Sequence, residues 1–305
     1  MRRTIFPFAA FILILAGEAF THARQTASQT TAVMSGILVK EWSPQRSSPL
    51  DLELGGELKG LPPGATRFVT REDLLALPQV SFTATDDEKF TGPTRVSGVM
   101  LDELMRALGG APSSDMFVAI CKDGYRANFT STYMAAHHPL LVLQVDGKAP
   151  PDWPKDVEHG GDLGPYTVSY LNFVFRFKIF AQADAPQIPW GVIRLDLRDE
   201  QAVFGVIAPR GPHADESAVQ AGYRIAQQNC FRCHNAGPEG GQKSERPWLV
   251  LAAWATASPD FFMAYVRDPK TKNPHSAMPG FPDYDDPTMR ALIAYFRTFS
   301  APPSH

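Results

Sequence analysis

Two cysteines and a histidine stand together in the run Cys230-Phe231-Arg232-Cys233-His234, near the C-terminus of the 305-residue chain. Two thiols three positions apart can each add across a haem vinyl group and hold the porphyrin through two thioether bonds. The histidine that follows is then placed to bind the iron from one side of the ring. These residue types at this spacing predict one covalent haem c, with Cys230 and Cys233 as attachment residues and His234 as an axial iron ligand.

Two other sites can use the same residue types. A tetrahedral zinc site needs a second pair of cysteine or histidine ligands at suitable spacing, but the remaining cysteine, Cys121, lies far upstream. A redox-active dithiol needs the two cysteines and has no need of the adjacent histidine. Haem attachment is therefore the interpretation that we favour for this run.

The second axial ligand of the iron is predicted to be Met278, within Ser276-Ala277-Met278-Pro279-Gly280-Phe281. Proline and glycine disfavour a helix at this point, so the methionine is expected on a constrained loop. A thioether ligand stabilises reduced iron and raises its potential, which suits an electron carrier. Met278 could instead only fill a gap in a core, as methionine commonly does, and His275 is a weaker candidate for the ligand.

From about Glu216 to Ser300 the chain resembles the class I cytochromes c. In that family the first and last helices cross at a small residue and aromatic side chains, and Gly222, Tyr223 and Tyr295 match this pattern. The resemblance implies a small all-α domain. It also implies that the carbonyl of Pro247 accepts a hydrogen bond from the ring of the iron-binding histidine, which fixes the orientation of that ring.

The N-terminus has the pattern of an export signal. Arg2 and Arg3 precede an apolar run that ends near Ala16, and small residues lead to a cleavage site after Ala23. We predict that residues 1–23 are a cleaved signal peptide, although an uncleaved anchor is the alternative. The apolar run is short for a membrane span. Since haem is attached to c-type cytochromes after export, we expect a periplasmic protein with no stable membrane span after cleavage.

Residues 24–212 are predicted to form an α+β domain. Strand-like apolar runs at Met116–Cys121 and Leu140–Val145 alternate with helical patterns such as Leu101–Leu108. The polar stretch Arg210–Asp215 contains glycine and proline and is typical of a linker. The predicted fold is therefore an α+β N-terminal domain followed by an all-α cytochrome c domain at residues 213–305.

The order of elements in the N-terminal part resembles the molybdopterin-binding domain of the sulfite oxidase family. The stretches that carry this resemblance are Leu77–Leu104, Lys122–Pro150 and the pair Gly164-Pro165. The family holds molybdenum through a cysteine on the strand after the Leu-Pro turn. The equivalent stretch here, Val80–Asp87, has threonines and no thiol, and threonine cannot build a soft metal–thiolate site. We therefore expect the fold without a molybdopterin cofactor.

Cys121 falls on a different predicted strand from that stretch. A small buried side chain within the core is the interpretation that we favour, because free cysteine is among the most buried residue types. The alternatives are a reactive thiol or a bridge to another molecule.

The formal net charge of −3 and the lack of a basic run give no indication of nucleic-acid binding. We predict periplasmic electron transfer by the haem, with the N-terminal domain docking a redox partner protein and no catalytic residues. The alternative is an enzyme, a molybdopterin-dependent oxidoreductase that passes electrons to its fused cytochrome. A haem sensor is the third possibility, and the predicted Met278 ligand argues against the open iron position that a sensor needs.

Overall fold

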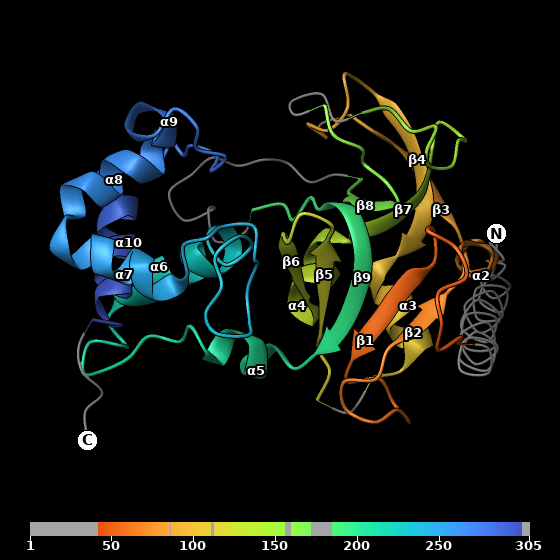
Figure 1. Cartoon of the computed structure of the whole chain (residues 1–305), viewed down its shortest axis with the longest axis horizontal. Coiled ribbons are helices and arrows are strands. Elements are labelled where there is room, and N and C mark those ends of the chain that lie inside the picture. Colours follow the sequence, from red (N-terminus) through yellow and green to blue (C-terminus); the bar gives the residue numbers. More distant parts are fainter. Residues whose placement is uncertain (1–41, 86, 111–112, 156–159, 172–184, 301–305) are drawn as a thin grey trace, which may run out of the picture.

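The computed structural model describes residues 42–85, 87–110, 113–155, 160–171 and 185–300. The predicted signal peptide at residues 1–23 lies outside these ranges. Figure 1 shows a sheet-rich N-terminal part on the right and a helical C-terminal part on the left. No helix in the described ranges is long and apolar enough to cross a bilayer.

The N-terminal part is built on one sheet, to which the described residues contribute nine strands. The strand order is β2-β1-β9-β8-β7-β4-β3, and β5 also pairs with β9 and carries β6 on its other side. β1 and β9 are parallel, whereas the other pairs are antiparallel. The strands are β1 (Leu52–Gly56), β2 (Arg67–Val69), β3 (Val80–Ala84), β4 (Thr94–Met100), β5 (Met116–Cys121), β6 (Arg126–Thr130), β7 (Leu140–Val145), β8 (Tyr166–Ser169) and β9 (Trp190–Arg198).

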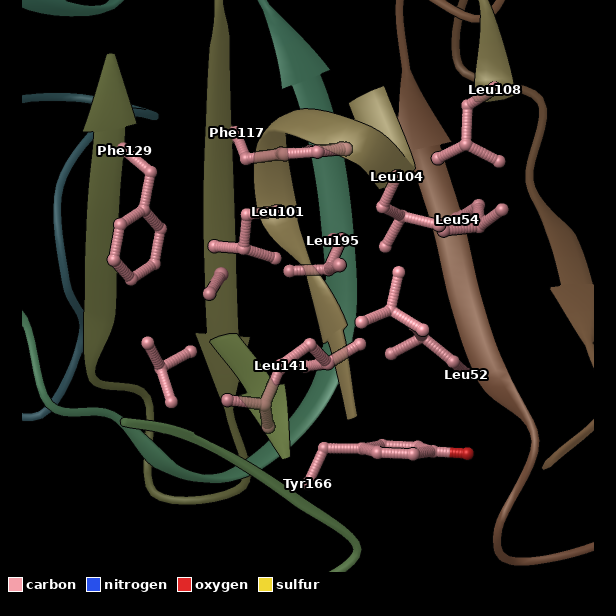
Figure 2. Close-up of a cluster of buried hydrophobic side chains, with 14 of the residues drawn as sticks. Leu52, Leu54, Leu101, Leu104, Leu108, Phe117, Phe129, Leu141, Tyr166 and Leu195 are labelled. Carbon is pink, nitrogen blue, oxygen red and sulfur yellow. The ribbon is translucent and has the colours of Figure 1, made fainter. Parts of the chain in front are cut away.

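Short helices join and cover these strands, and the α+β prediction for this part is confirmed. Alternating apolar residues of the strands meet the apolar stripe of one helix in a common core, in which Leu104 lies beside Leu54 (Figure 2). Burial of these side chains supplies most of the driving force for folding. The helices are α2 (Arg71–Ala76), α3 (Leu101–Leu108), α4 (Ser131–His137) and α5 (Glu200–Gly205).

The C-terminal part is helical, as predicted. Its first and last helices cross at Gly222, where a methyl group added to the glycine would come within 2.1 Å of the carbonyl oxygen of Ala291. The rings of Tyr223 and Tyr295 lie 5.6 Å apart beside this crossing. The prediction of a small residue and aromatics at the contact is therefore confirmed. The helices are α6 (Ser217–Asn229), α7 (Trp248–Ala257), α8 (Pro259–Arg267), α9 (Pro269–Lys272) and α10 (Asp286–Arg297).

One apolar cluster joins the two parts. It contains Met116 and Val118 of β5, Phe204 and Ile207 from α5 and the segment after it, and the core of the helical part. The hydroxyl of Tyr295 donates to the carbonyl of Ile207 over 2.6 Å. The packing of the helical part therefore extends to residues before the predicted linker, and the domain division at residues 212 and 213 stays a prediction.

Candidate haem-binding site

The Cys-x-x-Cys-His run is a turn that continues the end of α6. The amide of Cys230 still donates to the carbonyl of Ala226, over 2.9 Å, and the amide of His234 donates to the carbonyl of Cys230 over 3.0 Å. This winding brings both thiols and the imidazole onto consecutive turns of one short segment. Cys230 and Cys233 are half-buried and form no disulfide. Burial raises the pKa of Cys230 to about 12 and also raises the pKa of Cys233, so both are protonated at neutral pH.

The ring of His234 is fixed by a backbone carbonyl. Its Nδ1–H donates to the carbonyl oxygen of Arg246 over 2.7 Å. Because a carbonyl can only accept, the proton must be on Nδ1, which leaves the lone pair of Nε2 available for a metal. Burial lowers the pKa of His234 and so favours this neutral form.

The prediction that the carbonyl of Pro247 accepts this hydrogen bond is wrong by one residue. Pro247 is the N-cap of α7, and its carbonyl accepts from the amide of Val250 over 2.9 Å in the first turn of the helix. A residue before proline is biased towards the extended conformation. The carbonyl of Arg246, which lies outside the helix, is therefore the one that meets the imidazole.

Met278 lies on a loop between α9 and α10, as expected from the adjacent Pro279 and Gly280. The hydroxyl of Ser276 organises the loop, since it accepts from the amide of Met278 over 3.3 Å and lies 3.2 Å from the hydroxyl of Tyr265 on α8. The half-buried Met278 packs against the same apolar cluster as Cys230. The assignment of Met278 and His234 as iron ligands stays a prediction.

The residues around the run fit a bound haem. The hydroxyl of Tyr284 is buried and has no hydrogen-bond partner among the described residues, and Cys230 and Arg232 are its electrostatic neighbours. A buried polar group without a partner is rare in native proteins, so this hydroxyl is available to a polar group of a ligand. No cluster of three or more His, Cys, Asp or Glu side chains suited to a metal ion occurs in the described ranges.

The hairpin of β5 and β6 in the N-terminal part contacts this segment directly. The amide of Arg126 donates to the carbonyl of Arg232 over 2.9 Å, and the amide of Gln242 donates to the carbonyl of Gly124 over 2.8 Å. Gly124 has a φ of +83°, and a side chain there would also come within 3.0 Å of the backbone of Gln242. The hairpin turn therefore requires glycine for two reasons, and it lies against the haem-binding segment.

Glu239 forms a second link between the two parts. Its carboxylate is buried between the guanidinium groups of Arg126 and Arg198, at 3.6 and 2.5 Å. A further salt bridge joins Lys243 to Asp123 at 2.6 Å. The sequence analysis did not identify these residues, because each pair joins segments that are far apart in the chain and no local pattern marks them.

The stretch Val80–Asp87 ends at a residue that forms a buried ion pair. Asp87 and the fully buried Lys89 approach to 2.7 Å, and the hydroxyl of Ser169 donates to Asp87 over 2.7 Å. Thr83, on β3, is exposed. The polar groups of Asp87, Lys89 and Ser169 therefore pair with one another.

Cys121 is buried within the N-terminal core, so the favoured interpretation of this cysteine is confirmed. Burial raises its pKa well above the ordinary range of a thiol. The thiol is therefore neutral, which makes it a weak nucleophile and a weak metal ligand.

The helical part is similar in sequence to known proteins. Residues 217–296 match the family model of cytochrome c oxidase, cbb3-type, subunit III. A stretch of 91 residues is 31% identical to cytochrome c oxidase subunit 2 of Alkalihalophilus pseudofirmus, which corresponds to 27% of this chain and 26% of that protein. The chain thus matches about a quarter of the length of this curated relative.

The sheet-rich part was compared with solved structures. The crystal structure of the sulfane dehydrogenase SoxCD from Paracoccus pantotrophus aligns with 56% of this chain and 45% of its own, at 15% identity and a TM-score of 0.33. A TM-score this low does not support a functional inference. The family match and the helical fold together identify residues 217–296 as a cytochrome c domain, which follows a mixed α/β region.

Proposed function

We propose that this protein is a periplasmic electron carrier that holds one haem c through Cys230 and Cys233, with His234 and Met278 as axial ligands. The observation that carries the proposal is the turn at the end of α6, in which two free thiols precede an imidazole whose Nδ1–H is committed to the carbonyl of Arg246. A cytochrome c domain transfers electrons. The local geometry supports the attachment and ligand residues, and the export pattern of the N-terminus supports the location.

Each residue has a distinct task in this proposal. The bound haem would supply a one-electron iron couple. His234 presents Nε2 in a fixed orientation, because its other nitrogen is held by a backbone carbonyl. The loop of Met278 is held against α8 through Ser276 and through the 3.0 Å hydrogen bond from the amide of Phe281 to the carbonyl of Val266. The thioether and the apolar surroundings both favour reduced iron and so a higher potential.

The N-terminal region is proposed to dock the redox partner and to function without molybdopterin. The absence of a thiol at Val80–Asp87 and the internal pairing of Asp87 with Lys89 support the second point. The contact of the β5–β6 hairpin with the haem-binding segment supports the first, because a partner bound there would be close to the electron-transfer site.

The test is metal analysis and visible spectroscopy on protein produced with haem-maturation machinery. We expect one iron and no molybdenum per chain, and a thioether-to-iron charge-transfer band in the oxidised protein. Met278→Ala should abolish that band. The matched control, Met263→Ala, removes a half-buried methionine of α8 and should retain it. A band that survives Met278→Ala would overturn the ligand assignment, and stoichiometric molybdenum would favour the oxidoreductase alternative.

The location is tested by fractionating cells that express the full chain or a chain lacking residues 2–23. The full chain should yield haem protein in the periplasm with the N-terminus beginning at Arg24. The truncated chain should remain in the cytoplasm without haem. Haem protein that stays with the membrane fraction after salt washing would indicate the uncleaved anchor instead.

A further inference from the structure

The Cys-x-x-Cys-His run belongs to a longer loop, residues 230–247, which joins α6 to α7 and which we call the haem-attachment loop. The loop folds back on itself, since the amide of Ser244 donates to the carbonyl of Cys233 over 3.0 Å. The preceding carbonyl, of Arg232, bonds outside the loop. It accepts from the amide of Arg126 in the β5–β6 hairpin, over 2.9 Å. The run therefore depends on the N-terminal part for one of its main-chain hydrogen bonds.

The turn of the same hairpin also holds the returning half of the loop. The amide of Gln242 donates to the carbonyl of Gly124 over 2.8 Å. The hairpin is thus the acceptor in this hydrogen bond and the donor in the one to the run. Together with the ion pair of Asp123 and Lys243 at 2.6 Å, these bonds attach both halves of the loop to one hairpin. A displacement of the turn would therefore displace the run and the segment that returns from it.

The turn is itself anchored in the core of the N-terminal part. The amide of Cys121 donates to the carbonyl of Tyr125 over 2.9 Å, and the amide of Gly124 donates to the carbonyl of Cys121 over 3.1 Å. The side chain of Cys121 is buried in that core. The haem-attachment loop, by contrast, lies outside the named helices and strands. The sheet therefore fixes the turn, and the turn holds the loop.

The loop carries this constraint to the histidine. Ser244 follows Lys243 directly, and its hydroxyl accepts from the amide of Arg246 over 3.2 Å. The carbonyl of Arg246 accepts in turn from the Nδ1–H of His234. A group that holds the partner of a ligand also fixes the orientation of that ligand. The contact with the hairpin is therefore linked to the imidazole through a short, hydrogen-bonded stretch of main chain.

We propose that the β5–β6 turn is a positioning element of the haem site, with Asp123 and Gly124 as its positioning residues. The turn holds the haem-attachment loop in the conformation that places Cys233 and His234. The N-terminal part thus contributes to the site itself, besides docking a partner. The effect on the iron rests on the haem attachment proposed above, whereas the effect on the loop and its thiols does not.

The first measurement is the rate at which iodoacetamide alkylates each cysteine of the full-length chain before haem attachment, resolved by peptide mass spectrometry. Gly124→Ala strains a φ of +83° and brings a methyl group within 3.0 Å of the backbone of Gln242. It should raise the rate at Cys233 about two- to tenfold, the factor that corresponds to the loss of one hydrogen bond. Gly147→Ala is the matched control, because Gly147 has a φ of +74° and no atom within 4 Å of the added methyl group. It should leave the rate unchanged.

Asp123→Asn is a second variant that introduces no backbone strain. It breaks the partly exposed ion pair with Lys243 and should raise the alkylation rate at Cys233 by up to about fivefold. Glu103→Gln breaks an exposed ion pair on α3 and should leave that rate at the wild-type value.

The second measurement uses the haem-loaded full-length protein. In Gly124→Ala the electron paramagnetic resonance g-values of the oxidised haem should shift, because the ring of His234 loses part of its support. The reduction potential should fall, because water that enters the loosened site stabilises oxidised iron. Gly147→Ala should match the wild type in both quantities, although its backbone is strained to a similar extent.

The two measurements separate this inference from the proposed function. A wild type that binds no covalent haem would refute the proposed function, and the alkylation rates would still decide the inference. Equal rates at Cys233 in Gly124→Ala and Gly147→Ala would overturn it, as would equal g-values and potentials in the two haem-loaded variants. Equal acceleration of Cys121 and Cys233 would also overturn it, because the hairpin would then have unfolded as a whole.

Discussion

His234 owes its orientation to a main-chain group, so no side-chain replacement at the acceptor can remove the hydrogen bond. The acceptor, Arg246, precedes a proline, and its extended bias comes from the ring of Pro247. Pro247 thus acts on the imidazole through the backbone of its neighbour. If His234 binds iron as we propose, electron transfer would benefit, because a fixed ligand lowers the rearrangement that accompanies a change of iron charge.

Pro247→Ala should therefore change the haem more than it changes the fold. We expect the free energy of unfolding to fall by about 0.4–1 kcal/mol, since alanine leaves the unfolded chain more freedom. The electron paramagnetic resonance g-values of the oxidised haem should shift as the histidine ring rotates. Pro63→Ala, at an exposed loop position, should lower the free energy of unfolding by a similar amount and leave the g-values unchanged. Identical spectra for the two variants would contradict the role given to Pro247.

At this scale the sequence predicts the residue types at the site better than their contacts. The spacing of Cys230, Cys233 and His234 is a local pattern, and the proline and glycine after Met278 correctly predict a loop. The direction of a carbonyl depends on backbone angles, which a sequence does not show. The prediction for Pro247 was wrong for this reason.

Among the elements, the crossing of α6 and α10 decides where the haem-binding turn begins. Gly222 lets the two backbones approach, and a methyl group there would also lie 2.8 Å from the Cβ of Tyr295. Since α6 ends at Asn229, immediately before Cys230, a displacement of the helix would displace the attachment residues with it.

Gly222→Ala should therefore destabilise the haem-loaded protein by about 1–3 kcal/mol or more, the cost of overpacking a core. Urea unfolding followed by the haem absorbance measures this change. Gly205→Ala is the matched control, because Gly205 ends α5 and has no atom within 4 Å of the added methyl group. It should be neutral or up to about 1 kcal/mol more stable, since alanine favours helix. Equal effects of the two substitutions would show that the crossing is not tightly packed.

Elements with an uninterrupted apolar pattern were predictable, and β5, β7 and α3 have the predicted bounds. The sequence analysis did not identify β6, Arg126–Thr130, whose two faces differ in their surroundings. Its Phe129 packs in the N-terminal core, while Arg126 faces the helical part and Glu239. A strand whose polar residues are buried against another part of the chain has no local alternation that marks it as a strand.

In the whole molecule, the two parts are joined by a shared apolar cluster and by the charges around Glu239. These contacts make the N-terminal sheet a support for the haem-binding segment as well as a proposed docking surface. The two residues of each contact are distant in the chain. The sequence therefore predicts the fold of each part separately and gives no indication of how the two parts contact one another.

Glu239→Gln should loosen this junction. We expect a loss of roughly 1–3 kcal/mol, less than for a fully buried pair because the two arginines are partly exposed. Hydrogen exchange should accelerate at the amides of Arg126 and Gln242, which donate across the junction. Glu103→Gln breaks an exposed pair with Arg106 on α3 and should change stability by less than about 0.5 kcal/mol. Unchanged exchange in Glu239→Gln would show that the apolar cluster alone holds the parts together.

The hairpin of β5 and β6 precedes the haem-binding segment in the chain, and this order has a consequence for biogenesis. All nine of the described strands end before Cys230 in the chain, so the segment that carries Cys230 and Cys233 follows the whole of the sheet against which it packs. Both thiols are half-buried in the folded chain, whereas the covalent attachment that we propose would require them to be accessible. Under the proposed function, haem attachment and docking of the segment would therefore compete, and a delay in the first would leave an apoprotein whose attachment residues are folded out of reach.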